Sequence, residues 1–200
     1  VVTAPQSMGT LSPVLLERNE NLTAVLDRGE VVRCSPYLAK EGVIKSDKNI
    51  VGVVLKGVDS LYNLRFFEQY LVEGELPRIG REPHSRDVML SADVAQKMDI
   101  GVGERIEMLF VDTDDGLLRD RFVVSGLFKT GLDMIDNTLV ISDIRNVERF
   151  YVNGKSAVTG YELWLNEGVD VKMYSDVLNT DFMNLYFEHE INAEAFTMQT

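Results

Sequence analysis

The chain has one cysteine and two histidines among its 200 residues. A single cysteine excludes an intramolecular disulfide, so the chain does not belong to the small secreted domains that disulfides hold together. Cys34 lies in the apolar stretch EVVRCSPYL, where we expect a buried thiol that behaves as a small hydrophobic group. No motif connects Cys34 with His84 or His189, so a cysteine–histidine nucleophile is not indicated.

Long apolar runs are also missing. No stretch reaches the ~18 to 20 consecutive apolar residues that a membrane-spanning helix requires, and neither a signal peptide nor an initial methionine is visible. We therefore expect a soluble domain excised from a longer chain. The motifs of P-loop nucleotide binding, serine hydrolases, zinc proteases and C-x-x-C sites are absent, so the sequence indicates neither an enzyme nor a cofactor.

Positive charge is scarce relative to negative charge. Lysine and arginine number 20 against 32 aspartates and glutamates, which gives a net charge of -12. Such a surface repels the phosphates of nucleic acids and anionic lipid headgroups, so we expect no nucleic-acid partner. The composition, 45% hydrophobic and 26% charged, is typical of a folded globular protein. The length fits one larger domain or two small intertwined ones.

The first predicted element is a helix over residues 13–28. Ser12 is a candidate N-cap, and Gly29 is a candidate stop. Leu22 and Leu26 are among the apolar residues that recur at helical spacing between them.

The remaining patterns alternate between strand and helix. The predicted elements are strands at 30–44 and 49–59, a short helix within 60–71, a strand–helix–strand unit at 87–111 with Ser91 as the helix cap, a strand-rich segment at 119–143, a short helix within 142–154 capped by Ser142 or Asp143, a strand at 158–168, an amphipathic helix at 169–188 and a strand at 193–200. The two ends resemble halves of one α/β sandwich, with a β-rich middle inserted. This order predicts an α+β fold with a discontinuous outer subdomain.

The stretch LFVDTDDGLLRDRF, residues 109–122, concentrates acidic side chains. Its aspartates are Asp112, Asp114, Asp115 and Asp120. An EF-hand is excluded, because a loop that starts at Asp112 has Val123 where the bidentate glutamate is required. A weak calcium site on these four aspartates stays open. A catalytic carboxylate pair is disfavoured, because nothing separates the environments of the adjacent Asp114 and Asp115.

The same stretch also has the pattern of a β-hairpin. Strand-like segments RIEMLFV and RFVVSGLF flank Asp115-Gly116, a pair typical of type I′ turns. Leu117 and Leu118 follow the turn, and apolar side chains at such a position either fold back onto the domain or contact another molecule. The candidate partner-binding residues are Asp114, Asp115, Gly116, Leu117 and Leu118.

Three stretches in order resemble a known family. They are SPYLAKEGVI with VGVVLKGVD, then VMLSADVAQKMDIGVGERIEMLF, then RFVVSGLFKTGLDMIDNTLVISDIRNVERFY with VTGYELWLNE. Together they resemble the extracytoplasmic domain of ABC-transporter permeases of the LolC/LolE type, within the MacB/FtsX-like group. The resemblance implies a Porter-like α/β subdomain from residues 1–80 and 158–200, with a Sabre-like β-rich subdomain, 81–157, inserted between them.

The resemblance also implies a non-enzymatic role. The domain would loop out between two inner-membrane helices into the periplasm, beside a cytoplasmic ATPase subunit, a second permease chain and a periplasmic lipoprotein or chaperone. The implied task is lipoprotein release, with efflux coupling and control of cell-wall hydrolases as alternatives within the group. A free-standing calcium-binding module is the hypothesis from another class.

One feature departs from the lipoprotein-exporting branch of this family. That branch carries an extended loop on the hairpin, which hooks a chaperone, whereas this chain has only the short acidic VDTDDGLLRDR. A LolE-like role, a different partner and a shorter hook all stay open.

Overall fold

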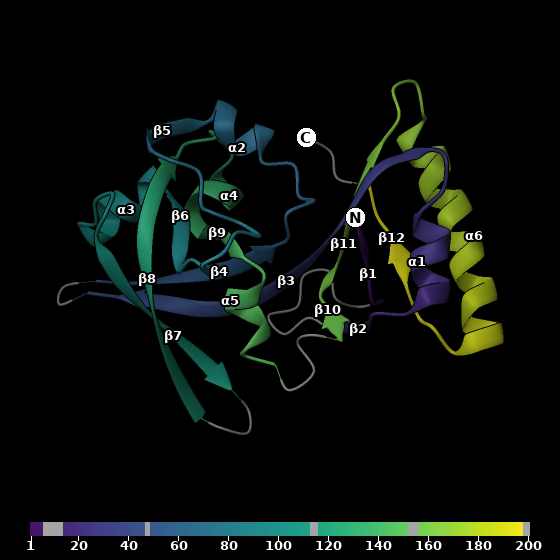
Figure 1. The fold of residues 1–200 in the computed structure, drawn as a ribbon, viewed down its shortest axis with the longest axis horizontal. Helices are drawn as coiled ribbons and strands as arrows, with labels where there is room; N and C mark the ends of the chain where they lie inside the picture. The colour runs from purple at the N-terminus through teal and green to yellow at the C-terminus, as the bar shows by residue number, and fades with distance from the viewer. Residues whose placement is uncertain (6–13, 47–48, 113–115, 152–155, 198–200) are drawn as a thin grey trace. The chain divides into compact units, whose positions relative to one another are not determined.

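The chain forms two compact units (Figure 1). The computed structural model describes residues 1–5, 14–46, 49–112, 116–151 and 156–197. The terminal unit consists of Val1–Leu38 and Asn153–Thr200, and the central unit consists of Ala39–Val152. The predicted mixture of helices and strands is confirmed, and one unit is built from both chain ends.

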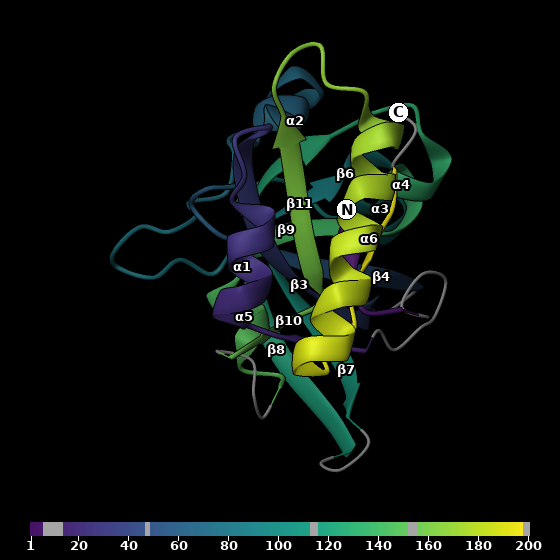
Figure 2. The same ribbon diagram turned by 90° about the vertical axis from the view of Figure 1, so that its right-hand side faces the viewer.

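The terminal unit is an antiparallel sheet with two helices on it. Its strands run in the order β12-β1-β11-β3, where β3 (Val31–Lys45) continues into the central unit, and β2 pairs separately with β10. Figure 2 shows α1 and α6 in front of β11. The elements of this unit are β1 (Val2–Thr3), β2 (Leu16–Glu17), α1 (Glu20–Leu26), β10 (Ala157–Val158), β11 (Gly160–Leu165), α6 (Val171–His189) and β12 (Glu194–Ala195).

Helix α6 illustrates why this unit folds. Apolar residues at helical spacing form its buried face, which packs against the sheet and α1: Tyr174, Leu178, Phe182 and Leu185. Asp170 caps the helix, because its Oδ1 accepts a hydrogen bond of 2.9 Å from the amide of Met173. The helix ends at Glu190, which has a left-handed backbone. The predicted amphipathic helix is thus confirmed. Among the described residues, no helix is both long and apolar enough to cross a bilayer.

The prediction of a helix from residue 13 was wrong at its start. Helix α1 begins at Glu20, and Asn19 caps it through a hydrogen bond of 2.8 Å from the amide of Asn21 to Oδ1. Leu16–Glu17 form strand β2 instead, which pairs with Ala157–Val158. A long-range strand pairing therefore overrides the local helical spacing. The proposed cap, Ser12, lies outside the described residues.

The central unit is a mixed sheet with short helices. Its strands run β3-β4-β9-β6-β8-β5, and β7 pairs with β8 and β3. Helices α3, α4 and α5 pack against β4, β6 and β9. The elements are β4 (Ile50–Val58), α2 (Arg65–Gln69), β5 (Leu71–Gly74), β6 (Asp87–Ser91), α3 (Ala92–Met98), β7 (Arg105–Asp112), β8 (Gly116–Phe128), α4 (Asp133–Thr138), β9 (Leu139–Asp143) and α5 (Arg145–Glu148).

The strand–helix–strand unit of this sheet matches its prediction. Strand β6 is buried along its whole length, and Ser91 both ends it and caps α3 by accepting a hydrogen bond from the amide of Val94. The predicted short helix within 142–154 is confirmed as α5, but its predicted cap was wrong. Ser142 and Asp143 end β9, and Ile144 is the N-cap position of α5. Helix α4 interrupts a segment that was predicted to be rich in strands.

The boundary between the units differs from the predicted position at residue 80. Residues 39–80 belong to the central unit, because β4 pairs in parallel with β9 and β5 pairs with β8. Helix α5 also approaches β4 closely. A Cβ atom added to Gly57 would lie 2.7 Å from the Cα atom of Ile144, so only glycine fits this position without a shift. Such pairings leave no mark on local sequence pattern.

Candidate functional site

Strands β7 and β8 form a long hairpin, here called the β7–β8 arm. Its antiparallel register runs from Arg105 opposite Val123 to Asp112 opposite Gly116, so the predicted hairpin is confirmed. Both views show the arm reaching beyond the other strands of the central unit (Figures 1 and 2). The prediction of Gly116 as a central turn residue was wrong: Gly116 begins β8 with a positive φ of 80° and pairs with Asp112.

The two faces of the arm differ in exposure, as strand alternation requires. Phe110 on the inner face is fully buried, and Leu118, half-buried, lies opposite it. On the outer face, Val111 and Leu117 lie opposite each other and are 74% and 53% exposed. The two candidate leucines therefore lie on opposite faces of the arm. Leu118 packs inward, and Leu117 forms an exposed apolar pair with Val111.

Of the four acidic candidates, the structure describes only the carboxylate of Asp120. Asp114 and Asp115 lie outside those residues, as does the side chain of Asp112. The buried carboxylate of Asp120 forms ion pairs with Arg86 and, at 3.3 Å, with Arg149. Two guanidinium groups already neutralise this carboxylate, which makes it a poor ligand for a further cation. No group of three potential metal ligands gathers anywhere in the described residues.

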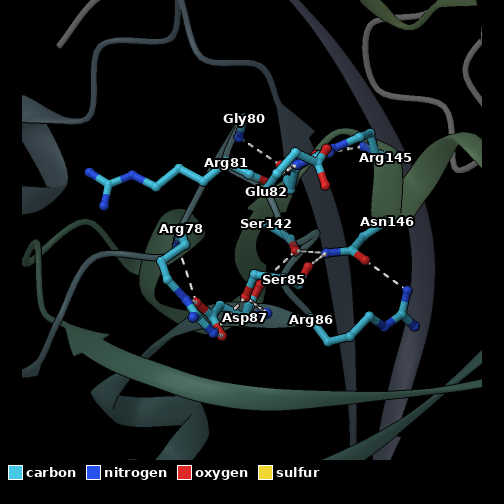
Figure 3. Close-up of polar contacts among 11 residues, drawn as sticks. Arg78, Gly80, Arg81, Glu82, Ser85, Arg86, Asp87, Ser142, Arg145 and Asn146 are labelled. Atoms are coloured by element: carbon cyan, nitrogen blue, oxygen red, sulfur yellow. Dashed lines mark hydrogen bonds and ion pairs between the residues drawn. The ribbon is translucent and has the colours of Figure 1, made fainter.

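Arg86 connects the arm to the rest of the central unit, and Figure 3 shows its contact with Asn146. Besides pairing with Asp120 of β8, it donates a hydrogen bond of 2.7 Å to Oδ1 of Asn146 on α5. The amide nitrogen of the fully buried Asn146 donates to the backbone oxygen of Ser85 and to the hydroxyl of Ser142, at 3.0 and 2.8 Å. The arm is therefore attached through buried polar groups to β9, α5 and the loop before β6.

Two arginine–carboxylate pairs hold that loop, residues 75–86. Arg78 forms a bidentate contact with Asp87, with Nε 2.8 Å from Oδ2. Arg145 makes the same type of contact with Asp143, whose Oδ2 also accepts a hydrogen bond of 2.7 Å from the amide of Gly80. Bidentate contacts of this kind fix orientation as well as charge. We call these two pairs, with Ser85, Arg86, Asp120, Ser142, Asn146 and Arg149, the arginine–carboxylate network.

Asp87 and Asp143 stay ionised. Burial alone raises the pKa of Asp87 and Asp143, but hydrogen bonds from arginine side chains and from backbone amides outweigh it. The pKa of each group therefore lies below its usual range. The pKa of Arg145 is raised, first by its hydrogen bond to Asp143. Every charge described here faces an opposite charge, so the network acts as an anchor for the arm.

The sequence indicated no cysteine–histidine nucleophile. His84 and His189 are exposed, and Cys34 is half-buried in the terminal unit instead of fully buried as predicted. The roles of Arg86, Arg149 and Asn146 could not be predicted from the sequence, because ion pairs and hydrogen bonds between segments so far apart in the chain have no local signal. Val111 and Leu117 are among several exposed apolar residues of the central unit, and these two lie opposite each other on the arm.

Comparison with known proteins identifies the fold. No protein-family model matches the chain, and no curated protein sequence matches it. The extracellular domain of the noncanonic ABC-type transporter YknZ from Gram-positive bacteria is similar with a TM-score of 0.62 at 12% identity, covering 98% of both chains. The periplasmic region of MacB from Actinobacillus actinomycetemcomitans is similar with a TM-score of 0.60 at 12% identity, covering 96% of this chain and 85% of the other. The resemblance to extracytoplasmic domains of ABC transporters is thus confirmed as a shared fold.

Proposed function

We propose that this chain is the extracytoplasmic domain of an ABC-transporter permease, without enzymatic activity of its own. Its task is to pass the motion driven by cytoplasmic ATP hydrolysis to a partner or substrate outside the membrane. The observation that carries this proposal is the fold, which the domains of two such transporters share over at least 96% of this chain.

The arrangement of the chain ends supports the proposal. The backbone nitrogen of Val1 donates a hydrogen bond of 2.8 Å to the oxygen of Phe196, and the amide of Phe196 donates one of 2.7 Å to the oxygen of Val1. A domain that loops out between two consecutive membrane helices has to leave and re-enter the membrane at neighbouring points. In this proposal the terminal unit is the Porter-like part and the central unit is the Sabre-like part.

The arm is the proposed contact with the partner. To pass the ATP-driven motion to a partner, the arm has to be rigid relative to the rest of the central unit. The arginine–carboxylate network provides this stiffness, because it ties Asp120 of the arm to α5 through Arg86 and Asn146. The exposed apolar pair of Val111 and Leu117 then supplies the contact surface.

Lipoprotein release from the inner membrane is the specific task that we propose. The domain would then face the periplasm, beside a cytoplasmic ATPase, a second permease chain and a periplasmic lipoprotein or chaperone. Efflux coupling is the second candidate, favoured because the similar structures include the periplasmic region of MacB and because the hairpin joins its paired ends Asp112 and Gly116 over a short distance in the chain.

The full-length gene tests the permease assignment. We expect membrane helices on both sides of this segment, and we expect the purified full-length protein to bring down an ATPase. A gene product without membrane helices and without an ATPase partner would contradict the proposal. Co-purification with a periplasmic lipoprotein chaperone would then separate lipoprotein release from efflux.

A further inference from the structure

The terminal unit contains an apolar cavity of about 250 Å³. It lies between the first half of α6 and strands β1, β11 and β12. The residues that line it, all in the described part of the chain, include Leu163, Trp164, Leu165, Val171, Tyr174 and Leu178. None of the residues around this cavity has a charged side chain, although 26% of the sequence is charged.

The few polar side chains of this cavity are neutral. The hydroxyl of Ser175 donates a hydrogen bond of 3.0 Å to the backbone oxygen of Ala195. Tyr174 is only 7% exposed, and its hydroxyl has no hydrogen-bond partner among the described residues. Burial raises the pKa of Tyr174, so the group stays uncharged at neutral pH. An apolar ligand with at most one hydrogen-bonding group fits such a lining.

The cavity also lies where the two chain ends meet. Val1 and Phe196, which bond to each other, both line it. Under the proposed function, on which this step rests, the membrane helices continue from these ends, so the cavity opens on the membrane side of the terminal unit. Val171 at its edge is 52% exposed, which leaves an apolar surface beside the opening.

We propose that this cavity binds one acyl chain of a lipid-modified molecule. The volume is below the ~300 to 1,000 Å³ of sites that enclose a drug-sized ligand, so it holds part of a single hydrocarbon chain. No side chain of the lining is a cation that could pair with a carboxylate, and the net charge of -12 repels free fatty acids. An esterified, uncharged chain is therefore the ligand class.

Trp164 makes the proposal measurable, because it is the only tryptophan of the chain and it lines the cavity. Bromine atoms on an acyl chain quench tryptophan fluorescence on contact. Two probes separate the sources of the chain: a triacylated lipopeptide with brominated chains, and phosphatidylcholine vesicles with brominated chains. Saturable quenching by the lipopeptide supports a lipoprotein ligand. Quenching by the vesicles alone supports a chain taken from the bilayer.

Two matched variants locate the binding. Val171→Asp places a charge at the edge of the cavity, at the first position of α6, where an acidic residue suits the helix dipole. We expect quenching to weaken roughly tenfold or more, since an apolar site disfavours a charge. Met173→Asp adds the same charge in the same turn, at an exposed position that does not line the cavity, and we expect unchanged quenching.

Two outcomes would overturn the proposal. One is the absence of saturable quenching by either probe, with the fold intact by circular dichroism. The other is an equal loss in both variants, which would indicate adsorption to the surface. A negative result would leave the permease assignment untouched, because the full-length gene and its ATPase test that assignment separately.

Discussion

The terminal and central units bury different kinds of side chain. Among the described residues, the buried carboxylates all belong to the central unit: Asp87, Asp120, Asp136 and Asp143. The buried polar residues of the terminal unit are uncharged, namely Thr3, Ser35 and Thr159. Its core is otherwise made of apolar residues from α1, α6 and the sheet. Both units also have apolar cores, so the stability of the central unit should depend on charge as well as on packing, and that of the terminal unit on packing.

This contrast is consistent with different roles for the two units. Paired charges with bidentate geometry specify one arrangement of the loop 75–86, α5 and the arm, which suits an element that transmits force. An apolar layer with a cavity tolerates an apolar guest, which suits an element that binds hydrocarbon. The following changes would break or sharpen this comparison.

The largest effect should come from the core of the terminal unit. Phe182 is buried on α6, and Phe182→Ala should lower the free energy of unfolding by about 3–5 kcal/mol, because it leaves a cavity. Urea unfolding followed by Trp164 fluorescence measures this loss. The exposed neighbour is the control: Met183→Ala should change stability by less than about 0.5 kcal/mol. Equal effects of the two variants would refute this packing.

A smaller but substantial effect should come from the network. Asp143→Asn removes a buried charge that Arg145 and the amide of Gly80 contact, and should cost about 2 kcal/mol. Loss of protection of the loop 75–86 in hydrogen exchange measures it. Glu82 contacts the same arginine but is exposed, so Glu82→Gln should have almost no effect. Similar losses for both variants would mean that burial does not matter here.

Acid should destabilise the central unit first, and alkali should destabilise the terminal unit first. The lowered pKa values of Asp87 and Asp143 stabilise the central unit above their unfolded pKa near ~4, and this stabilisation is lost as the pH falls below that value. The raised pKa values of Tyr161 and Tyr174, due first to burial, act in the terminal unit. Their contribution is complete below about pH 10 and is lost as the pH rises further.

Two measurements follow these pH effects. Pepsin cleavage at pH 3 should begin in residues 39–152, and Trp164 fluorescence should report alkaline loosening of the terminal unit above about pH 10. Cleavage that begins in the terminal unit in acid would contradict the comparison.

The smallest effect on stability should come from the outer face of the arm. Val111→Ser with Leu117→Ser changes exposed side chains only, so the free energy of unfolding should change by less than about 0.5 kcal/mol. Transport by the full-length permease should nevertheless fall, if this pair contacts the partner. Leu118→Ser is the control from the inner, half-buried face, and should cost about 1 kcal/mol. Unchanged transport in the double variant would exclude the outer face as a contact.

The sequence pattern correctly predicted elements that depend on neighbouring residues, such as helix caps and hairpins. Ser91 capped its helix as expected, and the alternating segments on either side of residues 113–115 paired as a hairpin. The parallel pairing of β4 with β9 and the pairing of β2 with β10 join segments far apart in the chain. Neither has a local signal, and for this reason the predicted boundary and the start of the first helix were wrong.

The site was harder to predict for the same reason. Leu117 and Leu118 are adjacent letters, and only the register opposite Val111 and Phe110 shows that they face opposite sides. Asp120 was grouped with the other aspartates as a possible metal ligand, whereas its contacts are Arg86 and Arg149, from distant segments.

The backbone pairing between Val1 and Phe196 has a consequence for the evolution of this fold. Because paired strands lie about 4.8 Å apart, the points at which the chain enters and leaves this domain are as close together as the two ends of a tight loop. Such a domain can enter the connection between two packed helices, whose axes are ~8 to 10 Å apart, with little need to rearrange them. Geometry of this kind is compatible with insertion of the domain between two helices without a long linker on either side.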